Sequence, residues 1–176
     1  MIQYNNISIS TLSVQHLYNQ GYRRIGYVCN HISAQPGMPN MGLAAALRML
    51  NLPIDPAWTL QMHATDEIFI EQVARMLSHP NRPDALTCFN DTVAASVYEA
   101  ARRAGLRVGA DLGVIGKDNS ALCDKLSPAL SSVETHCDEI ARLAVQTLLQ
   151  YTDFEHPPQA PYCLEPDIVA RQSTNR

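Results

Sequence analysis

The chain contains 176 residues, of which 46% are hydrophobic and 17% are charged. This composition suits one ordinary domain or two small lobes with a buried core, and it excludes wholesale disorder. Lysine and arginine total 13 against 17 aspartate and glutamate, so the formal net charge of −4 argues against a basic nucleic-acid-binding surface.

The lack of a recognisable targeting signal in this sequence and the pattern of its cysteines together predict a cytoplasmic protein. No apolar run is long enough to cross a bilayer, and the N-terminal residues lack the cationic and apolar stretches of a secretory signal. The five cysteines are widely spaced and form no C-x-x-C motif. We therefore expect reduced thiols, no metal site and no cofactor.

The first predicted element is an amphipathic helix near the N-terminus. Ser10 would cap it, Gly21 would end it, and Val14, Leu17 and Tyr18 recur on one face. That apolar face requires a surface to pack against.

The middle of the chain alternates short apolar runs with helical patterns. The runs predict buried strands over residues 23–29, 59–63, 85–89 and 112–116. Helical spacing fills each interval, with Pro39, Thr65 and Asp91 as the residues that would begin the three helices. Because strands joined by helices run parallel, this order predicts an α/β fold with a doubly wound parallel sheet and right-handed crossovers.

The C-terminal part departs from this alternation. The segment LSSVE precedes a predicted helix over residues 138–150, with Ile140, Leu143 and Ala144 on one side, and a proline-broken tail follows. The two flanking helices have no evident sheet of their own. Either they pack on the central block, or they belong to a lobe whose sheet lies outside this chain.

Polar residues follow each predicted strand of the block. Because ligands of open parallel sheets bind outside the carboxyl ends of the strands, these residues are candidates for a shared site. They are Asn30, His31, His63, Asn90, Asp91, Lys117, Asp118 and Asn119. Carboxylate and amide groups at such an edge suit a small molecule with several hydroxyls.

The two histidines leave several interpretations open. His31 and His63 could bind a ligand, act as general bases or stand as ordinary solvated loop residues. Together with Asp118 they could converge on a metal, although their spacing does not require it. The chain has no phosphate-binding glycine motif and no G-x-S-x-G nucleophile turn.

Three stretches together resemble the LacI/GalR family of transcription regulators. They are HLYNQGYRRIGYV, PDALTCFNDTVAASVYEAARRAGLRVGADLGVIGKDNS and LSPALSSVETHCDEIARLAVQTLL. The resemblance runs from about residue 3 to the end and corresponds to roughly the last half of a family member. It implies the C-terminal half of a sugar-binding sensor with the type I periplasmic-binding-protein fold.

The resemblance also implies a division of the chain into three parts. Residues 1–22 would be a remnant of the N-terminal lobe, residues 23–128 the C-terminal effector-binding lobe, and residues 129–176 the crossover, an N-lobe helix and the tail. The flanking helices would then belong to an incomplete second lobe.

The family pattern assigns effector contacts to Asn90 and Asp118, and it places Thr135 near the lobe crossover. With His31 and His63 these residues form the predicted effector site. Three other positions depart from the pattern. Pro39 stands where the family usually has an arginine, Lys117 replaces an aromatic residue, and Ala64 falls near the place of a pocket-lining ring.

These features predict a non-enzymatic, ligand-sensing portion of a LacI-type regulator. A small sugar-like effector, a carbohydrate, would bind between lobes, and DNA would be bound only through a helix-turn-helix domain that this chain lacks. The apolar faces around Val14 and Leu17 and around Leu143 would be uncovered, which predicts a homodimer or larger assembly.

Two alternatives remain at this point. The chain could be a truncated paralogue that pairs with an intact regulator without binding an effector. Less expected is a small α/β enzyme that uses His31, His63 and Asp118 at the edge of the sheet.

Overall fold

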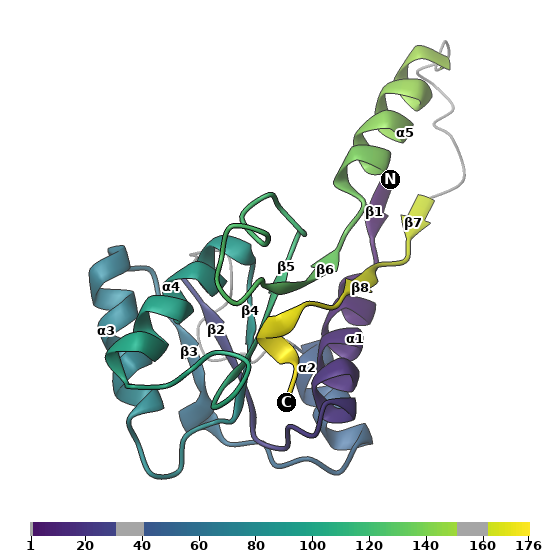
Figure 1. The fold of residues 1–176 in the computed structure, drawn as a ribbon. Helices are drawn as coiled ribbons and strands as arrows, with labels where there is room; N and C mark the ends of the chain where they lie inside the picture. The colour runs from purple at the N-terminus through teal and green to yellow at the C-terminus, as the bar shows by residue number, and fades with distance from the viewer. Residues whose placement is uncertain (1, 31–40, 151–161) are drawn as a thin grey trace.

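A computed structural model describes residues 2–30, 41–150 and 162–176 (Figure 1). Within these residues the larger sheet has six strands in the order β3-β2-β4-β5-β6-β8. The strands are β2 (Ile25–Cys29), β3 (Thr59–Gln61), β4 (Ala85–Cys88), β5 (Gly113–Lys117), β6 (Ser131–Glu134) and β8 (Asp167–Val169). The first five run parallel and β8 runs antiparallel to β6, which confirms the predicted doubly wound sheet.

Helices cover both faces of this sheet. The helices are α1 (Asn6–Asn19) and α2 (Met41–Met49) on one face, and α3 (Asp66–Leu77) and α4 (Asp91–Arg103) on the other (Figure 1). Leu86 and Val114 pack toward α3 and α4, whereas their neighbours Ala85 and Ile115 pack toward α1 and α2. Because both faces are covered, successive residues of these strands are buried instead of alternating, and only Lys117 at the end of β5 is partly exposed.

A smaller group of elements, the small subdomain, stands apart from the six-stranded sheet. It consists of strand β1 (Ile2–Tyr4), parallel strand β7 (Tyr162–Leu164) and helix α5 (Cys137–Gln150), which lies beside β1 (Figure 1). The sequence pattern does not identify these two short strands. The predicted three-part division of the chain stays a prediction.

Helix α1 differs from its prediction in two respects. Its cap is Asn5 instead of Ser10, because Asn5 Oδ1 accepts hydrogen bonds from the backbone N–H groups of Ile7 and Ser8, each at 3.2 Å. The expectation that Val14 and Leu17 are uncovered is wrong, since both are fully buried against α2 and the six-stranded sheet. The partner surface for this helix therefore lies within the chain.

The N-terminus of α4 also differs from its prediction. Asn90 is the N-cap, and its Oδ1 accepts a hydrogen bond from the backbone N–H of Val93 at 2.9 Å. Asp91 is the first residue of the helix and is only 2% exposed. Its Oδ1 accepts from the Ser132 hydroxyl at 2.6 Å, and its Oδ2 accepts from the backbone N–H of Ser120 at 2.7 Å.

A glycine makes room for this buried carboxylate. A Cβ at Gly116 would overlap Asp91 Oδ1, far inside van der Waals contact. Gly116 therefore lets α4 approach β5 closely enough for Asp91 to reach β6 and the segment after β5. One carboxylate joins three elements that are distant in sequence.

The C-terminal residues complete the core of the larger sheet. After β8, the short 3₁₀ helix Gln172–Thr174 brings the Ser173 hydroxyl against β5 and β6, where it donates to the Val114 carbonyl at 2.6 Å and accepts from Ser131 N–H at 2.8 Å. A second 3₁₀ turn, Pro56–Trp58, precedes β3. Among the described residues we find no helix with the length and apolar character that a bilayer span requires.

Substitution of the buried carboxylate tests its structural role. We expect Asp91→Ala to lower the free energy of unfolding in urea by about 2–4 kcal/mol, because Ser120 N–H and the Ser132 hydroxyl lose a charged acceptor inside the protein. Asp66→Ala is the matched control, since Asp66 holds the same first position of α3 but is exposed, and its loss is expected to cost about 1 kcal/mol or less. Equal effects of the two substitutions would contradict this role for Asp91.

Candidate functional site

The carboxyl ends of the parallel strands bring the predicted site residues to one edge of the sheet. Asn90 follows β4 and Asp118 follows β5, and these two strands are parallel neighbours in register. Thr135 follows β6, the next strand along. The prediction that Asn90 and Asp118 share an edge is therefore confirmed, while their role as effector contacts stays a prediction.

Asp118 is the half-buried carboxylate of this edge. Its Oδ1 lies 3.4 Å from the Thr135 hydroxyl, which donates to it, and 3.7 Å from Lys117 Nζ. Burial raises the pKa of Asp118, the nearby Lys117 charge opposes that rise, and the Asp91 carboxylate adds to it. Both contacts to Oδ1 are long, so this carboxylate can accept shorter hydrogen bonds from ligand hydroxyls.

Lys117, where the family pattern has an aromatic residue, lies beside a ring. Its Nζ is 4.9 Å from the centroid of the Phe89 ring and its side chain is mostly buried. The ammonium therefore lies between an aromatic face and the Asp118 carboxylate, an arrangement that stabilises a cation. The substitution adds a positive charge to this edge of the sheet.

The backbone at this edge adopts a left-handed conformation at three residues that are not glycine. The φ angles are 95° at Asp118, 46° at Asn119 and 54° at His136. Such conformations cost on the order of 1–3 kcal/mol each, and in proteins they cluster at ligand sites, where surrounding contacts impose them. These three residues follow β5 and β6, at the edge where the predicted site residues lie.

The other predicted site residues differ from Asp118 in their surroundings. Asn90 Oδ1 accepts the hydrogen bond that caps α4, which leaves one lone pair of Oδ1 and the two hydrogens of Nδ2 for a ligand. His63 is exposed after β3. Nearby, Asn30 exchanges two hydrogen bonds with the backbone of Ala64, at 3.0 and 3.2 Å, and so fixes the loop after β3. His31 and Pro39 lie outside the described residues.

An open pocket of about 480 Å³ lies beside Asp118, between the end of β5 and the start of α5. It is lined by Asp118, Asn119, Glu134, His136, Cys137, Asp138 and Glu139. In the described part of the chain, no group of three or more histidine, cysteine, aspartate or glutamate residues is placed to hold a metal ion. The alternative of a metal held by His31, His63 and Asp118 involves His31, which lies outside the described part of the chain.

Sequence reasoning missed Glu134 and His136 in this pocket. Glu134 Oε2 accepts from Asn119 Nδ2 at 2.9 Å, and its Oε1 accepts from His136 N–H at 2.8 Å. Burial acts to raise the pKa of Glu134, but these hydrogen bonds to its charged form outweigh burial and lower the pKa. Counting the segment 130–134 as a strand of the main sheet would have placed both residues at the same edge.

Comparisons with known proteins agree with this architecture. Residues 14–174 match the family model described as a periplasmic binding protein-like domain. The ribose operon repressor of Haemophilus influenzae is 31% identical over 163 residues, which cover 92% of this chain and 49% of that protein. The HTH-type transcriptional repressor CytR of Escherichia coli K12 is 29% identical over 178 residues, covering 98% and 51%.

Solved structures extend the similarity to three dimensions. A regulatory protein of the LacI family from Chloroflexus aggregans has a TM-score of 0.85 and 28% identity, over 98% of this chain and 62% of that one. A LacI family transcriptional regulator from Arthrobacter sp. FB24, in complex with lactose, has a TM-score of 0.83 and 26% identity, over 98% and 66%. This chain spans about half the length of the curated relatives it matches. Both relatives are named as repressors, in agreement with the expectation of a regulator.

The raised pKa of Asp118 predicts a pH-dependent effect of its neutral isostere. A carboxyl whose pKa is higher in the folded than in the unfolded state favours folding below the unfolded pKa, and this contribution is lost as the pH rises through the folded pKa. We therefore expect Asp118→Asn to raise the unfolding temperature by about 1–3 °C near pH 7, with the difference vanishing near pH 3, where the carboxyl is protonated in both states.

For Asp111→Asn we expect the opposite change in unfolding temperature. Hydrogen bonds from the Arg107 side chain lower the pKa of Asp111, so its charged form favours folding, and its replacement should lower the unfolding temperature near neutral pH. Calorimetry of both variants across the pH range measures the two trends. A lower unfolding temperature for Asp118→Asn at neutral pH would contradict the unfavourable burial of its charge.

Proposed function

This chain belongs to the family of periplasmic binding protein-like domains, as found in LacI-type transcriptional regulators, and from that premise we propose that it is the effector-sensing part of such a regulator. The effector we propose is a small carbohydrate or another molecule with several hydroxyl groups. The observation that carries this proposal is the half-buried, loosely contacted Asp118 carboxylate beside Asn90 and Thr135 at the carboxyl edge of the sheet.

The donors and acceptors at this edge suit hydroxyl groups. The Asp118 carboxylate accepts hydrogen bonds, the Asn90 Nδ2 donates them, and each hydroxyl of a sugar can do both. The Arthrobacter regulator, which is similar over nearly the whole of this chain, is described in complex with lactose, and the Haemophilus relative is named a ribose operon repressor. These names support a carbohydrate effector for this chain.

The connections between the two subdomains suggest how binding would be transmitted. The chain passes between the six-stranded sheet and the small subdomain at Asn5, after β6 at residues 135–136, and at residues 165–166. Asn5 Nδ2 donates to Glu165 Oε1 at 3.2 Å, so two of these connections are joined. His136, in the connection after β6, has its Nε2 3.0 Å from Oδ2 of Asp167, which directly follows the connection at residues 165–166. An effector bound at the carboxyl edge would favour one relative orientation of the two parts.

In the complete regulator this shift in population would alter the affinity for DNA. DNA contact is assigned to a helix-turn-helix part outside these 176 residues, since the net charge of −4 does not favour DNA binding by this chain. The regulator would act in the cytoplasm, where its operators and its effector meet.

Ligand screening tests the proposed function. We expect at least one compound among D-ribose, lactose, cellobiose and adenosine to raise the unfolding temperature, because a ligand at about 100 times its Kd stabilises the native state by about 2.7 kcal/mol. Asp118→Ala should weaken binding by roughly 10- to 100-fold, the usual value of a hydrogen bond to a charged group, and Asn90→Ser, which keeps a cap for α4, should also weaken it.

Glu71→Gln is the control variant, because Glu71 is exposed on α3, away from the carboxyl edge of the sheet. Its thermal shift should equal that of the unaltered chain. Binding that survives both Asp118→Ala and Asn90→Ser, or the absence of any shift with all four compounds, would contradict the proposal.

We also propose that the chain forms a homodimer or a larger assembly. Val145, Leu148 and Leu149 on α5 are large apolar side chains that are 56%, 71% and 80% exposed, and such patches favour association. Light scattering after size-exclusion chromatography should therefore give at least twice the mass of one chain. Leu148→Glu with Leu149→Glu should reduce that mass, whereas Ile68→Glu on α3 should leave it unchanged; a monomeric unaltered chain would refute the assembly.

A further inference from the structure

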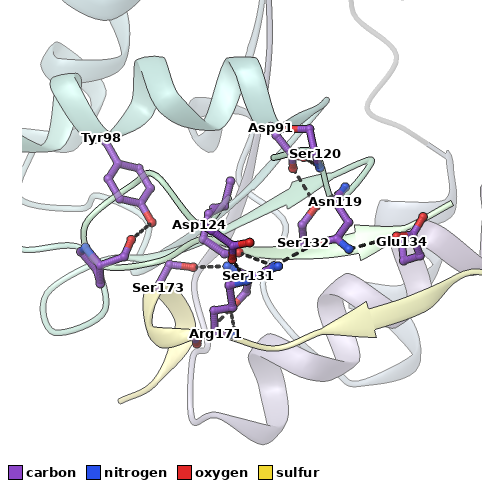
Figure 2. A network of polar contacts seen from close by, with 12 residues as sticks. Asp91, Tyr98, Asn119, Ser120, Asp124, Ser131, Ser132, Glu134, Arg171 and Ser173 are labelled. Carbon is purple, nitrogen blue, oxygen red and sulfur yellow. Dashed lines mark hydrogen bonds and ion pairs between the residues drawn. The ribbon is translucent and has the colours of Figure 1, made fainter. Parts of the chain in front are cut away.

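Arg171, close to the C-terminus, lies against the segment that carries Asp118. Its Nη1 donates to Asn119 Oδ1 at 3.0 Å, and its Nε lies 2.9 Å from Asp124 Oδ1 (Figure 2). Nη1 also donates to the Leu130 carbonyl at 3.0 Å. The arginine side chain is only 17% exposed. It thus brings a mostly buried positive charge from the end of the chain to the residue next to the proposed ligand contact.

The backbone of Arg171 is itself held in place. Its N–H donates to Ser131 Oγ at 2.8 Å, and the Ser131 hydroxyl lies 3.0 Å from the Arg171 carbonyl, to which it donates (Figure 2). Because Ser131 belongs to β6, the guanidinium extends from a fixed point on the sheet. A side chain with a fixed base and several partners loses little further freedom when it contacts Asn119.

The side chain of Asn119 is held at both ends. Its Oδ1 accepts from Arg171, and its Nδ2 donates to Glu134 Oε2 at 2.9 Å (Figure 2). A cation at the oxygen and a carboxylate at the nitrogen allow only one orientation of the amide. Asn119 is one of the two consecutive left-handed residues, so the contacts that hold its side chain also hold a strained backbone.

The backbone N–H groups of the same segment have three successive acceptors. Asp118 N–H donates to the Val133 carbonyl at 2.9 Å, Asn119 N–H to Ser132 Oγ at 3.0 Å and Ser120 N–H to Asp91 Oδ2 at 2.7 Å. These bonds come from β6 and α4, whereas Arg171 supplies the contact from the C-terminal segment. The position of Asp118 therefore depends on groups that hold the backbone of residues 118–120 and the side chain of Asn119, in addition to the long contacts of its carboxylate.

We propose that Arg171 is a positioning residue for the effector site, which holds Asn119 and thereby keeps the left-handed segment 118–119 in the conformation that presents Asp118 to the ligand. The proposal rests on the proposed function for the identity of the site. Arg171 does not contact the ligand in this scheme; it acts through Asn119. The C-terminal segment thus helps to hold the effector site in its conformation.

The ion pair with Asp124 offers a different explanation of Arg171. The Asp124 side chain is 73% exposed, and a pair with one partner in solvent contributes little to stability. If Arg171 served only this pair, removal of Asp124 would have the same local effect as removal of Arg171. Asp124→Asn is therefore the matched variant, because it removes the charge of the partner and leaves the Asn119 contact in place.

Amide hydrogen exchange of the whole chain, measured by NMR, tests the positioning role without any ligand. We expect Arg171→Gln to speed exchange at the backbone N–H groups of residues 118–120 at least tenfold relative to those in the middle of α3, and Asp124→Asn to change this ratio less than twofold. A loss of overall stability alone would speed exchange in both regions and would not change the ratio.

Asn119→Gly adds a second, independent measurement. Glycine adopts positive φ without strain, so in this background Arg171→Gln should have a clearly smaller effect on residues 118 and 120 than in the unaltered chain. An unchanged exchange ratio in Arg171→Gln, an equal change in Asp124→Asn, or full additivity with Asn119→Gly would each overturn the proposal.

Binding of the same four compounds separates this inference from the proposed function. We expect Arg171→Gln to weaken the binding of the compound that stabilises the unaltered chain, and Asp124→Asn to leave its affinity within a factor of two. Failure of all four compounds to bind the unaltered chain would overturn the effector assignment, and Arg171 would then hold the segment without serving a ligand. Unweakened binding by Arg171→Gln would overturn the positioning role and leave the proposed function standing.

Discussion

The buried carboxylate of Asp91 is the interaction on which the arrangement of this fold depends. It joins the N-terminus of α4 to the segment after β5 and to β6, and it can do so only because Gly116 leaves space for it. Removing a charge from water is expensive unless strong hydrogen bonds replace hydration. Asp91 meets this condition through Ser120 N–H and the Ser132 hydroxyl, and its position at a helix N-terminus is favourable for a negative charge.

The same contacts also organise the segment at the carboxyl edge of the sheet. Ser132 donates to Asp91 and accepts from Asn119, so the buried carboxylate and the left-handed segment share one hydroxyl group. The segment is strained and its carboxylate is half-buried, both of which oppose folding. Within the described residues every buried side-chain nitrogen or oxygen atom has a hydrogen-bond partner, so this unfavourable local geometry sits in a fully satisfied network.

The small subdomain is less completely buried than the six-stranded sheet. The larger sheet has helices on both faces and a continuous apolar interior, whereas α5 retains exposed leucines and lies beside a sheet of two short strands (Figure 1). Two short strands are at best marginally stable by themselves in water, so the small subdomain depends on the helix beside them. The geometry of the carboxyl edge is therefore set by the larger part of the molecule, and the connections at Asn5, His136 and Glu165 link the small subdomain to that edge.

The sequence alone determined the parallel sheet and the shared edge of Asn90 and Asp118, because apolar runs and helical spacing are local patterns and because parallel strands end on the same side. It did not determine which of two adjacent residues caps α4, since both Asn90 and Asp91 suit the position and only the location of Ser132 decides between them. The burial of Val14 and Leu17, the pairing of β6 with β8, and the reach of Arg171 to Asn119 were decided by the tertiary structure. Each joins residues far apart in the chain, and the periodicity of a local segment contains no information about which distant surface it will meet.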